Sequence, residues 1–253
     1  MARTGVFGRS GVGKSWMFGW FLEQVLPEFD YAFHVDVEDE EKGLSEPPTS
    51  MLKTFYCDKE FAESTVTVDG REVSLPTAVW LRNKKVRMVP DGMTDGEKYE
   101  VFAEISEAAM EVGKQGASVH LSSDEAHMLI PDKDDLDNRI ERMLSGGRKK
   151  GVEWAFCTQR PAKLHSMAFT QMNYGIFFHL PKDADRMKVN GSVGFDAYHM
   201  LEEMGERECY IENADTSELQ HLMTDDLTRE TPHYAKDDGI ADRALDAAGE
   251  VVD

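Results

Sequence analysis

The first residues that could do chemistry form a phosphate-binding loop near the start of the chain. Residues 8–15 read G-R-S-G-V-G-K-S, a match to G-x-x-x-x-G-K-[ST] directly after an apolar run and directly before a helical pattern. The glycines let successive backbone N–H groups point inward, and the N-terminus of the following helix adds a positive end. We expect Lys14 to reach the β- and γ-phosphates of ATP and the Ser15 hydroxyl to bind Mg²⁺. The predicted nucleotide-binding residues are Gly8, Arg9, Ser10, Gly11, Val12, Gly13, Lys14, Ser15 and Trp16.

Two adjacent carboxylates follow a second apolar run. Residues 117–125 read A-S-V-H-L-S-S-D-E, a strand pattern that ends in Asp124 and Glu125. Acids at the end of a neighbouring strand would complete a phosphoryl-transfer site, with Asp124 on Mg²⁺ and Glu125 as the general base for water. A pair of surface acids is the alternative in so acidic a chain. The strand pattern and the upstream loop favour the catalytic interpretation.

A third polar group ends the strand expected over residues 152–157. Ligands of open α/β sheets gather at the carboxyl ends of the strands, so Gln159 should lie beside the γ-phosphate if this strand runs between the two motif strands. Its amide can both donate and accept, which suits a residue that senses phosphate and orients water. A glutamine that merely caps its loop is the alternative.

The elements that must position these groups alternate along the chain. Short apolar runs separated by helical patterns predict an α/β fold, with a mostly parallel central sheet and helices on both faces. Strands are expected over residues 3–7, 31–37, 85–89, 117–122, 152–158, 174–180 and 208–212. Helices are expected over residues 14–26, 96–112, 134–144, 184–189 and 196–204. Trp16, Phe18 and Trp20 crowd the first helix, where core packing is a better interpretation than a base-stacking platform.

One segment interrupts this alternation. Residues 64–75 alternate with period 2 around Asp69-Gly70, which predicts a β-hairpin insertion over about residues 61–78 on the main sheet. We assign residues 1–224 to one ATPase-like domain. Residues 225–253 carry many Asp and Ala and few large apolar side chains, so we expect an acidic C-terminal tail or a single helix there.

Composition narrows the class of protein. The chain is 41% hydrophobic without a long uninterrupted apolar window, so it is expected to be soluble and globular, with no membrane span. Nothing at the start resembles a signal peptide. Cys57, Cys157 and Cys209 are widely separated, which favours neither a disulfide framework nor a zinc cluster and indicates a reducing cytoplasm. His120 and His127 lack the H-E-x-x-H spacing of a metalloprotease.

The charge balance points away from nucleic acid at first. Lys and Arg number 28 against 48 Asp and Glu, a formal net charge of −20. DNA binding needs Lys and Arg to neutralise phosphates. An acidic surface adapted to high salt is the favoured explanation, and an ordinary acidic cytoplasmic protein or an acidic face for a partner are the alternatives.

Together the motifs resemble the FtsK–HerA superfamily of DNA-translocating ATPases. The phosphate-binding loop, residues 8–15, corresponds to the Walker A motif, and the strand that ends in Asp124-Glu125 corresponds to Walker B. Residues 147–161 then read G-R-K-K-G-V-E-W-A-F-C-T-Q-R-P, whose T-Q-R-P is the discriminating part. Asp185-Arg186 and residues 201–210 extend the resemblance over about residues 3–212. It implies a RecA-like P-loop NTPase core that assembles as a homo-oligomeric ring, expected to be a hexamer, around double-stranded DNA. It also implies an arginine acting on the neighbour's nucleotide, with Arg148 as the first candidate and Arg186 or Arg160 as the second.

The chain departs from the large members of that superfamily. They carry a membrane anchor, a domain before the motor and a winged-helix module after it, whereas here the loop begins at residue 8. The chain is more similar to the genome-packaging ATPases of membrane-containing double-stranded DNA viruses, and its acidity suits a virus of a halophilic archaeon. This resemblance implies the host cytoplasm, a packaging vertex of the virion, and a capsid-vertex or membrane-embedded portal protein as partner. The loops after Asp91-Gly92 or around Lys149-Lys150 could contact the DNA backbone.

Two other functions stay open. One is a morphogenesis, secretion or conjugation ATPase of the same superfamily, which normally needs a membrane segment. The other is a P-loop phosphotransferase or nucleotide-dependent switch. A translocase should form rings and hydrolyse ATP faster with double-stranded DNA, whereas a kinase would phosphorylate a small acceptor and ignore DNA.

Overall fold

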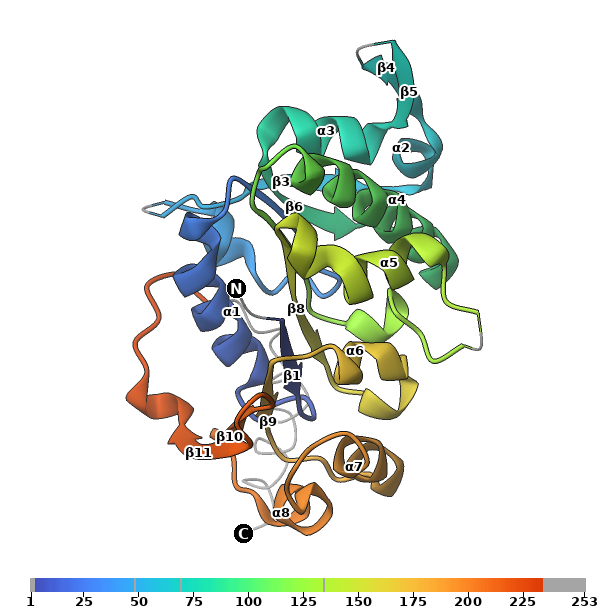
Figure 1. Cartoon of the computed structure of the whole chain (residues 1–253). Coiled ribbons are helices and arrows are strands. Elements are labelled where there is room, and N and C mark those ends of the chain that lie inside the picture. Colours follow the sequence, from blue (N-terminus) through green and yellow to red (C-terminus); the bar gives the residue numbers. More distant parts are fainter. Residues whose placement is uncertain (1–2, 48, 69, 134, 234–253) are drawn as a thin grey trace, which may run out of the picture.

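A computed structural model describes residues 3–47, 49–68, 70–133 and 135–233 (Figure 1). Its main sheet has nine strands in the order β11-β10-β9-β1-β8-β7-β2-β6-β3. Within it, β10 is antiparallel to both of its neighbours and the other pairs are parallel, which confirms the predicted mostly parallel sheet. The strands are β1 (Thr4–Phe7), β2 (Tyr31–Val35), β3 (Lys53–Cys57), β6 (Lys85–Pro90), β7 (Val119–Ser123), β8 (Val152–Thr158), β9 (Tyr174–Phe177), β10 (Glu208–Asn213) and β11 (Glu218–Met223).

Helices cover both faces of this sheet. The helices are α1 (Lys14–Val25), α2 (Lys59–Glu63), α3 (Leu75–Asn83), α4 (Asp95–Lys114), α5 (Asn138–Gly146), α6 (Ser166–Thr170), α7 (Asp183–Asn190) and α8 (Ala197–Glu203). Buried side chains of α1, including Phe18 and Leu22, form one core cluster, and those of α4 and α5 belong to the other. Phe18 therefore packs in the core and Trp20 packs against it, as predicted. Trp16 is only partly buried and belongs to neither cluster, so the prediction of core packing was wrong for this side chain.

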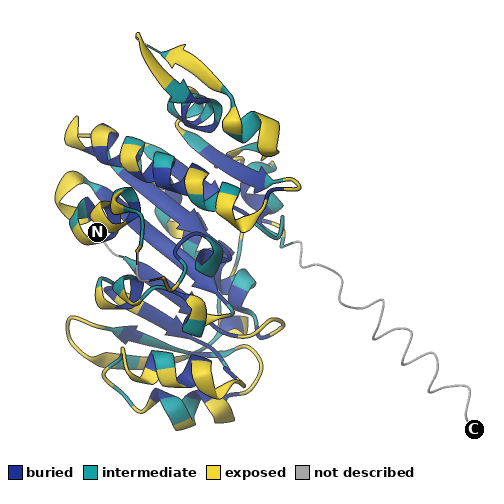
Figure 2. Ribbon diagram, turned by 90° about the vertical axis from the view of Figure 1, so that its right-hand side faces the viewer, coloured by how far each residue is buried: buried dark blue, intermediate teal, exposed yellow. Residues whose placement is uncertain are grey.

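The central strand β8 shows why the sheet sits between two cores. All seven of its residues are buried, and its side chains alternate between the faces. Trp154 and Phe156 belong to the cluster under α4 and α5, while Ala155 and Cys157 belong to the cluster under α1. Burial on both faces explains the nearly continuous apolar run of this strand, and Figure 2 shows the same burial across the middle of the sheet.

The predicted hairpin forms, but away from the main sheet. Strands β4 (Thr65–Val68) and β5 (Arg71–Ser74) pair only with each other, as a separate two-stranded sheet. They project beyond α2 and α3 at the top of Figure 1. Asp69 of the turn and Asp134, where the third predicted helix begins, lie outside the described residues; α5 itself starts later, at Asn138.

Several elements were not expected. Strand β3 lies at the edge of the sheet, and only its last residue is fully buried, so it lacks the apolar run of a central strand. Strand β11, at the other edge, has no fully buried residue. Helices α2 and α6 have five residues each, too few for a helical period to show.

The end of the described chain differs from a solvated tail. Residues 225–233, which the sequence assigns to the acidic C-terminal segment, run against α1, and Thr231 is buried there. The remainder of that segment, residues 234–253, lies outside the described residues. The packed part of the chain therefore continues past residue 224.

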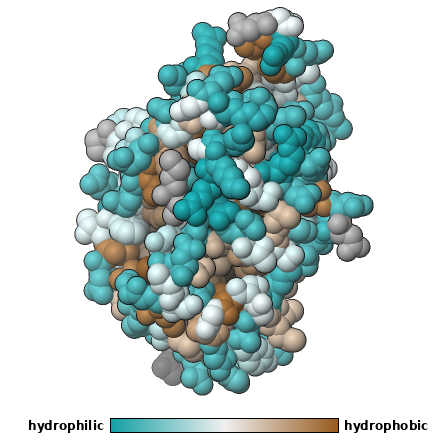
Figure 3. All heavy atoms as spheres, viewed as in Figure 1, coloured by the Kyte–Doolittle hydropathy of each residue, from teal (hydrophilic) through white to brown (hydrophobic). Residues whose placement is uncertain are grey.

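The surface is largely hydrophilic on the side seen in Figure 3, where apolar residues form small patches between polar ones. Among the helices of the described part of the chain, none is both long and apolar enough to cross a membrane.

Candidate nucleotide site

The loop between β1 and α1 adopts the backbone of an anion-binding loop. Gly11 and Gly13 have φ values of 81° and 94°, in the left-handed region that glycine favours. Gly13 immediately precedes α1, so the N-terminus of this helix faces the loop. The loop starts where the Gly8 N–H donates to the Thr158 carbonyl of β8 at 3.3 Å. The first turn of α1 therefore lies beside the carboxyl end of the sheet, where a phosphate would sit.

Lys14 lies at the inner end of this loop as a buried cation. It is 6% exposed, and its Nζ donates to Cys157 Sγ of β8 at 3.3 Å. Burial opposes its charged form, yet the neighbouring Cys157 and Glu125 raise the pKa of Lys14 above the ordinary value. Burial also raises the pKa of the Cys157 thiol to about 12, so the thiol is protonated at neutral pH. Lys14 thus carries its positive charge into the site at any physiological pH.

Asp124 ends β7 and holds the loop that follows β2. Its carboxylate accepts hydrogen bonds from the backbone N–H groups of Val37 at 2.8 Å, Glu38 at 2.9 Å and Glu125 at 2.8 Å. Burial and the charge of Asp36 raise the pKa of Asp124. The side chain is therefore costly to keep ionised without a cation close by.

Glu125 and Gln159 meet directly, as their strand ends predict. Strand β8 lies between β1 and β7, and Gln159 Nε2 donates to Glu125 Oε1 at 2.7 Å. Burial opposes ionisation of Glu125, but His127, Lys14 and Gln159 together hold its pKa below the ordinary value. Glu125 is consequently a carboxylate at neutral pH, the form that a general base needs.

His127 is a residue of this site that sequence reasoning set aside. Its Nδ1 lies 3.1 Å from Glu125 Oε2 and 3.0 Å from Thr158 Oγ1. Although His127 is close, none of the described residues makes a hydrogen bond of good geometry to Glu125 Oε2. His127 thus links the end of β7 to the end of β8 and orients the carboxylate, while Oε2 keeps lone-pair capacity for a water proton.

A cavity of about 530 Å³ joins these groups. Most of the predicted residues line it, whereas Gly8 and Val12 do not, and Val12 is buried in the core under α1. The predicted lining residues are Arg9, Ser10, Gly11, Gly13, Lys14, Ser15, Trp16, Asp124, Glu125 and Gln159. The lining residues that were not predicted are Glu38, Glu40, Arg207, Thr224, Asp225, Leu227 and His233.

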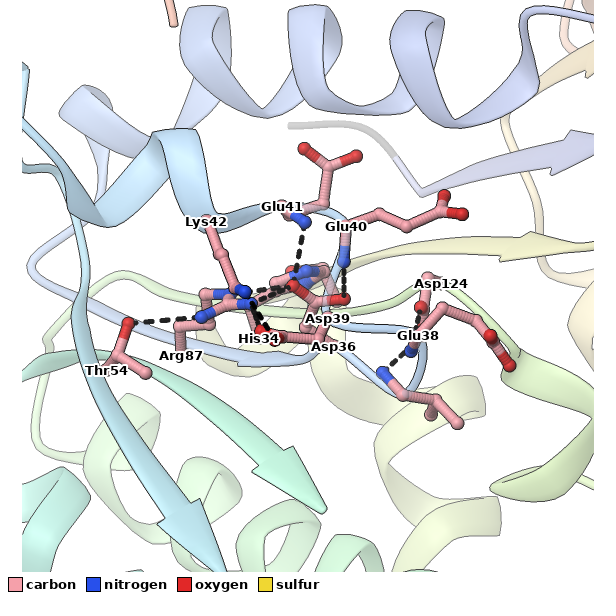
Figure 4. A network of polar contacts seen from close by, with 12 residues as sticks. His34, Asp36, Glu38, Asp39, Glu40, Glu41, Lys42, Thr54, Arg87 and Asp124 are labelled. Carbon is pink, nitrogen blue, oxygen red and sulfur yellow. Dashed lines mark hydrogen bonds and ion pairs between the residues drawn. The ribbon is translucent and has the colours of Figure 1, made fainter. Parts of the chain in front are cut away.

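Glu38 and Glu40 enter the cavity from the acidic loop after β2 (Figure 4). Asp36 fixes this loop by accepting the backbone N–H groups of Glu40 and Glu41 at 3.1 and 2.8 Å. Arg87 of β6, buried beside it, pairs with Asp36 at 2.6 Å. The sequence could have placed Glu38 and Glu40 in the site, because β2 lies next to β7 and the carboxyl ends of both strands face the same cavity.

The candidate arginines lie elsewhere. Arg148 is exposed in a 3₁₀ turn (Gly147–Lys150) before β8, at the opposite end of the strand from Gln159. Arg186 is buried and donates to the carbonyls of Leu180 and Pro181 at 3.1 and 3.0 Å, so it holds the segment after β9. Arg160 does not line the cavity either. Within one subunit, the structure brings none of the three to the nucleotide site.

A glycine-rich loop on β1, adjacent carboxylates ending β7 and a polar residue ending the intervening β8 define a RecA-like P-loop NTPase fold. Known structures share it. The genome packaging NTPase B204 from Sulfolobus turreted icosahedral virus 2, in complex with sulfate, superposes with a TM-score of 0.64 over 87% of this chain and 94% of that one, at 15% identity. VirB4 of Thermoanaerobacter pseudethanolicus gives 0.61 over 87% and 88%, at 11% identity.

EssC (ATPases 2 and 3) from Geobacillus thermodenitrificans gives a TM-score of 0.55 over 99% of this chain and 44% of that one, at 12% identity. At such identities the likeness concerns the fold. Comparison of the sequence with family models and with curated proteins gives no match.

Proposed function

We propose that this protein is an ATP-hydrolysing translocase of double-stranded DNA, acting as a viral genome-packaging motor of the FtsK–HerA type. The observation that carries the proposal is the meeting of Lys14, Glu125 and Gln159 in one cavity, each from a different strand end of a RecA-like sheet. The same fold in the genome packaging NTPase B204 supports the DNA-packaging role.

Each polar group of the cavity has a distinct task in this proposal. Lys14 and the loop amides bind the β- and γ-phosphates of ATP, and Gln159 responds to the γ-phosphate. Glu125 accepts the proton of the attacking water. Ser15 and Asp124 both line the cavity and offer the oxygen donors that Mg²⁺ prefers, and the ion would neutralise phosphate charge.

The distribution of charge supports a ring built head to tail. Carboxylates cluster at the carboxyl end of the sheet, around the cavity. The amino end carries basic residues just before, or at the first position of, four strands: Arg3, Lys53, Lys84, Lys85, Arg148, Lys149 and Lys150. Burial and the nearby Arg148 lower the pKa of Arg3, as expected where cations crowd. Opposite ends of opposite charge favour a heterologous contact, which closes into a ring when the rotation allows.

Such a contact would bring Arg148 of one subunit toward the ATP of its neighbour, and a hexamer is the expected ring. Lys149 and Lys150, exposed in the same turn, are candidates for sequence-independent contacts with DNA phosphates, as is the exposed loop at Asp91-Gly92. We propose that the motor works in the host cytoplasm, docked at a packaging vertex on a capsid or portal protein. The net charge of −20 would then belong to its outer surface.

The first test of this function is the effect of DNA on ATP hydrolysis. We expect linear double-stranded DNA to raise the ATPase rate several-fold, and the stimulation to fall as salt rises because phosphate contacts release counterions. Hydrolysis is followed by phosphate release across a salt series, and ring formation by light scattering at the same concentrations. A monomeric ATPase that DNA leaves unchanged would contradict the proposal.

Arg148→Ala belongs in the same series. An arginine acting in trans contributes about 10³ to 10⁵ in rate, so this variant should assemble normally yet lose nearly all hydrolysis. Arg82→Ala, which removes an exposed arginine of α3, is the matched control. Normal ATP turnover by Arg148→Ala would show that Arg148 does not act on the neighbour's nucleotide. The proposed head-to-tail contact would then be wrong.

Two alternatives are separated by these measurements. EssC and VirB4 share the fold, which keeps a secretion or conjugation ATPase as one alternative. Such an ATPase would also form an oligomer, but its hydrolysis would not need double-stranded DNA. A phosphotransferase or nucleotide switch would hydrolyse ATP slowly and without a ring.

A further inference from the structure

The end of the described chain forms a strap over the nucleotide cavity. The C-terminal strap, residues 224–233, follows β11 and runs along α1. It begins beside the phosphate-binding loop, because the Thr224 N–H donates to the Arg207 carbonyl at 2.8 Å and the Arg207 N–H donates to the Val12 carbonyl at 3.0 Å. The strap is therefore attached to the loop at its first residue.

Arg229 fixes the middle of the strap. Its side chain is 2% exposed and pairs with Glu41 at 2.5 Å and with Glu23 of α1 at 3.4 Å. The same Glu23 carboxylate accepts the backbone N–H groups of Glu230 and Thr231 at 2.8 and 2.7 Å. Removing one partner of a pair buried this deeply leaves an uncompensated buried charge, so Arg229 and its two carboxylates hold the strap against α1.

Helix α1 is shaped to receive this side chain. A side chain at Gly19 would overlap the guanidinium of Arg229. Glycine is otherwise unfavourable in the middle of a helix. Its presence on α1 is explained by the close approach of the strap.

Four residues of the strap line the cavity. Thr224 and Asp225 belong to its polar part, with the loop amides, Lys14 and the other carboxylates, whereas Leu227 and His233 form its less polar part together with Trp16. Burial and the charge of Arg229 lower the pKa of His233 to about 4, so its ring is uncharged at neutral pH. A nucleotide has the same two halves, a charged phosphate chain and a flat base that stacks on apolar and aromatic groups.

We propose that the C-terminal strap forms the nucleoside subsite, with the base of the bound nucleoside triphosphate held by Leu227, His233 and Trp16. The inference rests on the proposed ATP site and extends it, because the phosphate half is assigned by the loop and the base half by a segment about 210 residues later. Affinity for the base then depends on Leu227 and His233, and affinity for the phosphates does not.

The test compares a nucleotide with a triphosphate probe that lacks the nucleoside. Binding of the β,γ-methylene analogue of ATP and of inorganic tripolyphosphate, both with Mg²⁺, is measured by titration calorimetry. Leu227→Ala and His233→Ala should each weaken the ATP analogue by about 10-fold, as expected for a lost base contact, and leave tripolyphosphate within about twofold. Gly19→Ala should act in the same direction, because its methyl group displaces Arg229. Leu219→Ala, a leucine of β11 outside the cavity, is the matched control.

Each other outcome is decisive. Unchanged affinity for the ATP analogue in both Leu227→Ala and His233→Ala would overturn the subsite. Equal losses for the two probes would also overturn it, since the strap would then act on the phosphate half or on folding. If the unaltered protein bound neither probe, the proposed function itself would fail, whereas binding of tripolyphosphate alone would reject only the nucleoside subsite.

Discussion

Replacement of Lys14 by alanine should weaken ATP binding by about 100-fold and abolish turnover. The lysine is the buried cation at the floor of the cavity, with Glu125 close enough to raise its pKa. Hydrogen bonds to charged groups contribute about 1.5–3 kcal/mol each, and 1.4 kcal/mol is about tenfold in affinity. The loss of the cation also leaves the carboxylates of the cavity facing the phosphates without compensation.

The affinity of Lys14→Ala is measured by titration with the ATP analogue, and its fold is checked by circular dichroism. Lys59→Ala is the matched control, because Lys59 is an exposed surface lysine paired with Glu63 and Glu97. ATP binding by Lys14→Ala at the unaltered affinity would mean that the loop does not hold phosphate through this side chain.

Glu125→Gln should keep ATP binding and lose hydrolysis by about 10²- to 10⁴-fold, the usual contribution of a general base. The amide matches the carboxylate in shape and can still accept the hydrogen bond from Gln159, so the cavity should be preserved. What disappears is the basic oxygen Oε2, which is buried beside His127. Single-turnover measurement of bound ATP and released phosphate separates the two effects.

Glu63→Gln provides the same change of carboxylate to amide at the surface and should turn over ATP normally. Rapid hydrolysis by Glu125→Gln would reject the general-base role. Failure of Glu125→Gln to bind ATP would assign the side chain to binding instead of chemistry.

The nucleotide site was largely predictable because its residues follow strong local patterns. Lys14 belongs to a motif whose strand and helix are both apolar enough to recognise. Glu125 and Gln159 each end a strand that is buried on both faces, so their meeting follows from the order of parallel strands. His127 was discounted because its role depends on contacts with Thr158, which no spacing rule predicts.

The strap was not predictable for a different reason. Its position depends on the ion pairs that Arg229 makes with Glu23 and Glu41. Both glutamates are far from Arg229 in the sequence, and in so acidic a chain nothing distinguishes them from the other carboxylates. The strap has few large apolar residues, so its composition indicated a solvated segment instead. For Arg186 the sequence predicted too much. Its place in a family-like Asp-Arg pair suggested a catalytic arginine, whereas its side chain donates hydrogen bonds to the carbonyls of Leu180 and Pro181.

The most direct test of the central claim is movement along DNA driven by ATP. Linear double-stranded DNA carrying a bound third-strand oligonucleotide is mixed with the protein, and release of the oligonucleotide is followed after ATP is added. We predict release that requires ATP, fails with the β,γ-methylene analogue, and is absent with Glu125→Gln although that variant binds ATP. Rapid ATP hydrolysis by the unaltered protein on the same DNA, without release of the third strand, would contradict a translocase.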